Sequence, residues 1–201
     1  MYRNCETYDR LDRLAIDLYC DYGFNRFPLD VQEVCNKLGL MLVPYSAYKA
    51  SERDLLKKRS VYGFLQPLSA DAPATIYVND DLMDVHSNGI IRKTIYHEIK
   101  HFVCGDKDDA DDDLAEHFGK YFPCPIPHLI VNGISSPNEI VSRFAVDMSD
   151  ACSIASQLCN RRTRYGSHIF DYEKPLIELL DPVYYQIYLE RQDEEEMRWG
   201  S

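Results

Sequence analysis

The chain has 201 residues, 45% hydrophobic and 27% charged, a composition typical of soluble globular proteins. Its formal net charge of −11 argues against binding nucleic acid by neutralising phosphates, which needs a basic face. The candidate for a local basic patch is the cluster of Arg161, Arg162 and Arg164. The sequence contains no apolar run of the roughly 18 residues needed to span a bilayer, so we expect no contact with a membrane.

The first part of the chain alternates helical and extended patterns. Apolar residues at helical spacing predict helices over residues 5–22 and 29–38, the second ending at Gly39. Short apolar runs predict strands over residues 40–44, 61–65 and 75–78. The polar and basic residues 46–60 are expected to form a loop or a frayed helix. We expect the last strand, in the segment ATIYVND, to be an edge that an extended substrate could join.

The second part of the chain is predicted to be helical. The clearest pattern covers residues 87–104, where an apolar stripe runs from Ile90 to Val103 before Gly105. Further helices are expected over the ranges 114–122, 137–145 and 150–159, and in the acidic tail after 181. The chain is therefore predicted to be α+β. A domain over residues 1–130 would pack a small mixed sheet on the 87–104 helix, and a helical subdomain would cover 131–201.

The 87–104 helix contains the sequence His97-Glu98-Ile99-Lys100-His101, which matches HExxH. Two histidines four residues apart lie on one face of a helix, so both imidazoles can bind one ion. Glu98 is adjacent to the first ligand, where its carboxylate can act as a general base on metal-bound water. Zinc suits two imidazoles and a carboxylate with a fourth position open. The alternative is an amphipathic helix that merely exposes two histidines.

An acidic helix follows and could supply the third ligand. Asp112 and Glu116 are four residues apart and so share a helix face, as a metal ligand and its outer partner should. On this interpretation Asp112 binds the metal, and Glu116 orients His97 or His101. The alternative makes Glu116 the ligand, because Asp112 is one methylene shorter than the usual glutamate. The neighbouring Asp108, Asp109 and Asp113 are interpreted as solvated.

From about Asp9 to Arg162 the chain resembles the ImmA/IrrE family of metallo-endopeptidases. The resemblance rests on three blocks, IYVND…TIYHEIKH, LAEHFGKYFPCP and PNEIVSRFAVDMSDACSIASQL. The chain has Lys100 where the family usually has a small residue, and Asp112 where it has glutamate. Lys100 is expected to be harmless, because its position faces away from the metal. The aspartate puts the third ligand in question.

The resemblance implies a zincin-like core and cleavage of a helix-turn-helix transcriptional repressor that silences a mobile element, prophage or stress regulon. Residues and spacing alone indicate only a zinc hydrolase, with Glu98 as the general base and His97, His101 and Asp112 as the metal ligands. One alternative is a regulatory protein that binds such a repressor without cutting it. Another is a DNA-binding regulator, because residues 139–158 resemble a helix-turn-helix. The acidic charge of the chain and the small number of basic residues in this segment make nucleic acid an unfavoured partner.

Two further features bear on location and on the site. The seven cysteines are odd in number and form no CxxC pair, and the N-terminal residues lack the apolar stretch of a secretion signal. We therefore expect reduced thiols and a soluble, cytoplasmic protein. His128 follows the acidic helix and is considered as a minor candidate for stabilising the oxyanion.

Overall fold

The computed structural model describes residues 7–70, 72–83, 88–106 and 112–199. The helices in these ranges are α1 (Tyr8–Tyr22), α2 (Val31–Leu38), α3 (Ala50–Arg59), α4 (Asn88–Cys104), α5 (Asp112–Tyr121), α6 (Ile126–Val131), α7 (Pro137–Phe144), α8 (Met148–Tyr165), α9 (Lys174–Leu180) and α10 (Pro182–Trp199). The strands are β1 (Met41–Pro44), β2 (Gly63–Gln66) and β3 (Thr75–Val78). Short 3-10 turns are η1 (Tyr45–Ala47), η2 (Asp80–Met83) and η3 (Asp171–Glu173).

The three strands form one small mixed sheet with the order β1-β3-β2. β1 runs parallel to β3, with Met41 opposite Thr75, and β2 runs antiparallel to it, with Gly63 opposite Val78. The α+β class with a small mixed sheet is thereby confirmed. The expectation that β3 is an edge strand is wrong. β3 has the more continuously buried residues and takes the centre, which leaves β2 as the edge beside α4.

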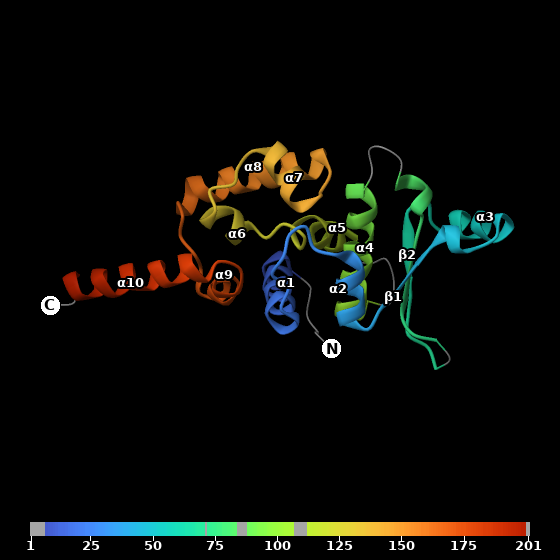
Figure 1. Ribbon diagram of the computed structural model, residues 1–201, viewed down its shortest axis with the longest axis horizontal. Helices are drawn as coiled ribbons and strands as arrows, with labels where there is room; N and C mark the ends of the chain where they lie inside the picture. Colours follow the sequence, from blue (N-terminus) through green and yellow to red (C-terminus); the bar gives the residue numbers. More distant parts are fainter. Residues whose placement is uncertain (1–6, 71, 84–87, 107–111, 200–201) are drawn as a thin grey trace.

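Helix α4 lies near the middle of the molecule, with the sheet on one side and the helices α6 to α10 on the other (Figure 1). Its buried apolar residues Ile91, Ile95 and Ile99 belong to the same core cluster as Ile76 and Val78 of the sheet. α5 packs along another side of α4 and makes its most extensive helix contact. α4 therefore carries the HExxH residues on a support that is fixed from two directions.

The buried apolar residues form two clusters along the chain. One runs from α1 through α5 and includes Leu176 of α9, and the other begins at Cys124 and is built mainly from α6, α7 and α8. Phe27 packs against both clusters, so the second rests directly on the first. The division into domains at residue 130 stays a prediction.

Several elements differ from the expectations. Residues 50–59 form a regular helix, and α8 continues to Tyr165, six residues beyond the predicted end at Cys159. The short helices α6 and α9 were not predicted; each has a proline in its first turn, where the missing N–H is tolerated. The expectation of wholly reduced thiols is wrong at Cys104, which is disulfide-bonded. Among the other described cysteines, Cys20, Cys35, Cys124, Cys152 and Cys159 are free.

Candidate metal centre

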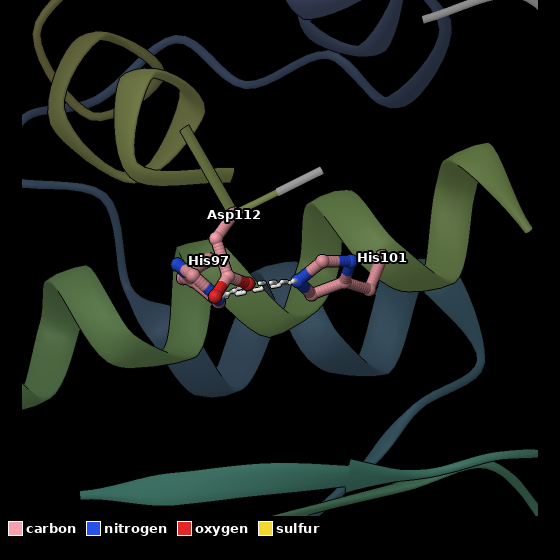
Figure 2. Close-up of side chains that lie close together, drawn as sticks. All are labelled: His97, His101 and Asp112. Atoms are coloured by element: carbon pink, nitrogen blue, oxygen red, sulfur yellow. Dashed lines mark hydrogen bonds and ion pairs between the residues drawn. The ribbon is translucent and has the colours of Figure 1, made fainter. Parts of the chain in front are cut away.

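The two histidines of the motif lie one turn apart on α4 and turn their Nε2 atoms toward each other. These atoms are 3.2 Å apart. His101 is buried, and the His97 side chain is 18% exposed. Figure 2 shows both rings on the face of α4 that looks toward the start of α5. Two imidazole nitrogens at this separation can contact a common ion, as their spacing in the sequence predicts.

Asp112, in the first turn of α5, completes the cluster. Its Oδ1 lies 3.8 Å from Nε2 of His97 and 3.8 Å from Nε2 of His101 (Figure 2). A triangle with these sides has a centre about 2.1 Å from every corner, which equals the length of the bonds that zinc forms with imidazole nitrogen and carboxylate oxygen. The donor set and its geometry therefore fit a metal ion of this size.

The short aspartate reaches this position on a helix that packs closely against α4. A Cβ atom on Gly119 would lie 2.9 Å from the backbone oxygen of Lys93, so only glycine permits this approach of the two helices. Glu116, one turn after Asp112, is directed elsewhere. Its Oε1 lies 3.6 Å from Nδ1 of His97, on the side of the ring away from the cluster. The arrangement thus places Asp112 within the candidate cluster and Glu116 behind His97.

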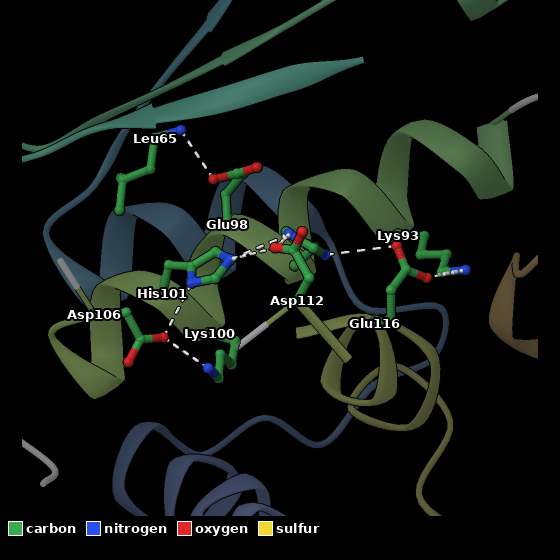
Figure 3. A network of polar contacts seen from close by, with 9 residues as sticks. Leu65, Lys93, Glu98, Lys100, His101, Asp106, Asp112 and Glu116 are labelled. Carbon is green, nitrogen blue, oxygen red and sulfur yellow. Dashed lines mark hydrogen bonds and ion pairs between the residues drawn. The ribbon is translucent and has the colours of Figure 1, made fainter. Parts of the chain in front are cut away.

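Glu116 is in turn held by a lysine of α4. Nζ of Lys93 lies 2.6 Å from Glu116 (Figure 3). It also lies 3.4 Å from the buried Asp150 at the start of α8. Burial lowers the pKa of Lys93, but the hydrogen bond to Glu116 and the charge of Asp150 outweigh this effect and leave the pKa raised. Lys93 therefore stays charged and links α4, α5 and α8 beside the cluster.

His101 has its own outer carboxylate, which the sequence interpretation missed. Nδ1 of His101 lies 3.0 Å from Oδ2 of Asp106, and the same oxygen accepts a hydrogen bond from Nζ of Lys100 at 2.6 Å (Figure 3). The expectation that Lys100 is harmless overlooked this contact. Gly105 was the signal for this contact, because a glycine at a helix end folds the next residue, here Asp106, back over the last turn.

Glu98 lies between His101 and the edge strand β2 (Figure 3). Its Oε2 accepts a hydrogen bond of 2.9 Å from the backbone N–H of Leu65 in β2. Glu98 and the three candidate ligands line one open cleft of about 950 Å³. Its lining also includes Phe64 and Leu65 of β2 and, at the start of α8, Asp147 and Ser149. A cleft of this volume has room for a polypeptide segment beside Glu98 and the candidate ligands.

The pKa of His97 lies below its ordinary value of 6.5. Burial is the main cause, and the neighbouring His101 adds to it; the carboxylates of Glu116 and Asp112 act in the opposite direction. The neutral ring therefore persists to lower pH than in an exposed histidine. Because only the neutral imidazole can coordinate a metal, this shift favours binding.

Other singled-out residues lie away from the cluster. Nδ1 of His128 is 2.6 Å from Asp181, and His128 is absent from the described lining of the cleft, so the suggestion that it stabilises an oxyanion there is wrong. Arg161 pairs with the buried Glu173 at 2.5 and 2.6 Å and offers no free cation to a phosphate. Asp113 is exposed, whereas Asp108 and Asp109 lie outside the described residues.

The segment that resembles a helix-turn-helix forms α7 and α8, which pack against each other. The start of α8 lines the cleft that holds the candidate metal centre. Asp150 is buried there and lies 3.4 Å from Lys93 and 3.8 Å from Lys120. These contacts favour a packing role for the segment, and a role in DNA binding stays an unfavoured alternative.

Comparisons with protein-family models, with curated proteins and with solved structures find no match for this chain. In the part of the chain that the structure describes, none of the helices is both long enough and apolar enough to cross a membrane. The functional conclusion therefore rests on the residues of the cluster and on their geometry.

Proposed function

We propose that the protein is a zinc-dependent endopeptidase with a zincin-like catalytic core. The observation that carries this proposal is that the two HExxH histidines and Asp112 surround a point about 2.1 Å from three donor atoms, while Glu98 lines the same cleft. Two neutral imidazoles with one carboxylate form the ligand set of catalytic zinc sites that keep a position open.

The residues then have distinct roles. His97, His101 and Asp112 would hold the ion, which on binding supplies a Lewis acid that polarises the scissile carbonyl and acidifies water. The Glu98 carboxylate takes the proton of the attacking water and later gives it to the departing amine. Glu98 suits both steps because it lies beside the first ligand on a helix whose backbone is held by the sheet and by α5.

A peptide substrate is supported by the position of β2. The outer edge of this strand faces the cleft, because the backbone N–H of Leu65 is directed at Glu98 rather than at β3. An extended peptide could pair with this edge and bring a carbonyl group to the candidate zinc position. We infer that such pairing replaces the bond between Leu65 and Glu98 and leaves the carboxylate to bind water.

A more specific substrate follows from the sequence resemblance alone. If the chain is an ImmA/IrrE-type enzyme, its substrate is a helix-turn-helix repressor, and its location is the cytoplasm. The alternative, a protein that binds such a repressor without cutting it, retains the same fold. The carboxylate beside the candidate ligands favours cleavage, because a protein that only binds has no use for a general base.

The test is to incubate the zinc-loaded protein with a proteome-derived peptide library and to identify new termini by mass spectrometry. We expect cleavage by the natural protein and a loss of 10²- to 10⁴-fold in Glu98→Gln, which keeps the shape of the side chain but cannot accept the proton. The variant should retain its zinc. Equal cleavage by both proteins would remove Glu98 from the mechanism, and peptide binding without new termini would support the non-cleaving alternative.

A further inference from the structure

Lys100 is fully buried, although it lies within the HExxH motif and carries an ionisable amine. Its Nζ donates to Oδ2 of Asp106 at 2.6 Å, and the Asp106 side chain is itself only 14% exposed. The same Oδ2 lies 3.0 Å from Nδ1 of His101 (Figure 3). One carboxylate oxygen therefore joins a buried lysine to a candidate metal ligand.

The end of α4 brings these three groups together. Gly105 adopts φ 70°, and its N–H bonds to the carbonyl of Phe102 at 3.2 Å, while the N–H of Asp106 bonds to the carbonyl of His101 at 3.0 Å. This pair of bonds forms a Schellman motif, which folds the chain back over the last turn of the helix. The fold-back places the Asp106 side chain next to the His101 ring and to the lysine that precedes it.

The chemistry of the shared oxygen fixes the direction of each hydrogen bond. A lysine ammonium can only donate, so Oδ2 of Asp106 acts as an acceptor toward it. The same oxygen then accepts from Nδ1–H of His101. A neutral imidazole with its proton on Nδ1 has a lone pair on Nε2, the atom that lies 3.2 Å from Nε2 of His97.

We propose that Lys100 is a positioning residue for the metal centre. Through Asp106 it holds His101 in the tautomer, and in the ring orientation, that present Nε2 to the ion. This inference rests on the proposed function insofar as it treats His101 as a zinc ligand. It does not follow from the motif, in which the residue before the second histidine carries no role.

The lysine on the other side of the site provides a matched control. Lys93 also lies on α4 and also contacts a carboxylate behind a histidine, but its Glu116 is 54% exposed and lies 3.6 Å from His97. A solvated carboxylate contributes little to fixing its neighbours, because water competes for it. Loss of Lys93 should therefore disturb the site much less than loss of Lys100.

The first measurement is zinc affinity, obtained by competition with a chromophoric chelator on the purified full-length protein. We expect Lys100→Met to weaken binding by about 10- to 100-fold, the range typical of lost outer-sphere partners. Lys93→Met should change it by less than about 3-fold, because the carboxylate that it leaves behind His97, Glu116, is exposed to water. The buried Asp150, which Lys93 also contacts, keeps Lys120 at 3.8 Å. Equal effects of the two variants would overturn the inference.

Lys100→Met leaves a buried carboxylate without its lysine, which can destabilise the fold by itself. The double variant Lys100→Met/Asp106→Ala avoids this problem, because it removes both charges. We expect it to fold and still to bind zinc about 10- to 100-fold more weakly than the natural protein. Natural affinity in a folded double variant would show that the pair serves stability alone and would overturn the inference.

The second measurement needs no metal. Imidazole ¹⁵N NMR of the metal-free protein at pH 8 reports which nitrogen of each histidine carries the proton. We expect His101 to be in the Nδ1–H form in the natural protein and to shift toward the Nε2–H form in the double variant. An Nε2–H form in the natural protein would contradict the inference. If the tautomer behaves as expected but zinc does not bind, the proposed function fails while the positioning role stands.

Discussion

The two histidines of the candidate metal centre are one turn apart, yet they are held in different ways. Behind His101, the carboxylate of Asp106 and its partner Lys100 are 14% and 0% exposed; behind His97, Glu116 and Lys93 are 54% and 25% exposed. The distance from Nδ1 to the carboxylate follows the same order, 3.0 Å on the buried side and 3.6 Å on the exposed side.

The comparison shows that similar residues in a similar order can act differently according to burial. A carboxylate out of water and bonded to a buried ammonium has few alternative partners, so it can fix a ring. A solvated carboxylate exchanges its partners with water and restrains the ring less. The centre therefore combines one firmly held candidate ligand, His101, with one that can adjust, His97.

The largest expected effect comes from Asp112, the candidate ligand that lies near both histidines. Asp112→Ala leaves two imidazoles without a carboxylate, so we expect it to lose more zinc affinity than the 10- to 100-fold typical of an outer partner, together with all cleavage. Zinc titration against a chelator measures the affinity, and peptide cleavage measures the activity.

Asp113→Ala is the matched control, because Asp113 is the next residue on the same turn and is exposed. It should bind zinc as the natural protein does. If Asp112→Ala binds zinc more tightly than Glu116→Ala does, the assignment is contradicted and Glu116 is the third ligand.

The exposed side should be less sensitive. Glu116→Ala removes a carboxylate 3.6 Å from His97, and we expect zinc affinity to fall by about 10-fold, the lower end of the range for such partners. The same titration compares it with Lys100→Met. If Glu116→Ala loses much more zinc affinity than Lys100→Met, the carboxylate behind His97 matters more than the one behind His101, contrary to the comparison.

A smaller effect is expected where α5 approaches α4. Gly119→Ala places a methyl group 2.9 Å from the backbone oxygen of Lys93, which should move α5 outward and cost about 1–3 kcal/mol of unfolding free energy. Alanine normally stabilises a helix by about 1 kcal/mol relative to glycine, so a loss here identifies a steric cause. Denaturant unfolding measures it. Increased stability would show that the helices are not held at this distance.

The smallest effect concerns pH. The folded-state pKa of His97 lies below its ordinary value of 6.5, chiefly because of burial, so the unfolded chain takes up a proton first as the pH falls. The stability that depends on neutral His97 is present above pH 6.5 and is lost as the pH falls through the folded-state pKa. Thermal unfolding of metal-free protein at several pH values measures this loss. The loss of stability at low pH should be smaller in His97→Gln than in the natural protein. An equal loss in the two proteins would show that other groups cause it.

The sequence predicted the parts of the site that depend on spacing within a helix. His97 and His101 share a face because they are four residues apart, and Asp112 and Glu116 repeat the relation on the next helix. Asp106 and Lys93 could not be found in this way. Asp106 reaches His101 only through the turn at Gly105, and Lys93 matters only because α5 brings Glu116 to it.

The fold was predicted in its elements more than in their arrangement. Gly39 and the apolar periodicity marked α1, α2 and α4 well, because capping and amphipathicity are local. The order of the strands depends on which one buries both faces against other elements, and short strands of four residues carry little of that information. The edge was consequently assigned to β3 rather than β2.

The central claim is that His97, His101 and Asp112 together hold one zinc ion. Elemental analysis of protein prepared without chelator tests it most directly, with His97→Ala and His101→Ala prepared in parallel. We predict about one zinc ion per natural chain, as expected for a single catalytic site, and nearly none in either variant. Because His101 is the more firmly held ligand, its variant should lose zinc at least as completely. Zinc contents of both variants equal to that of the natural protein would contradict the account.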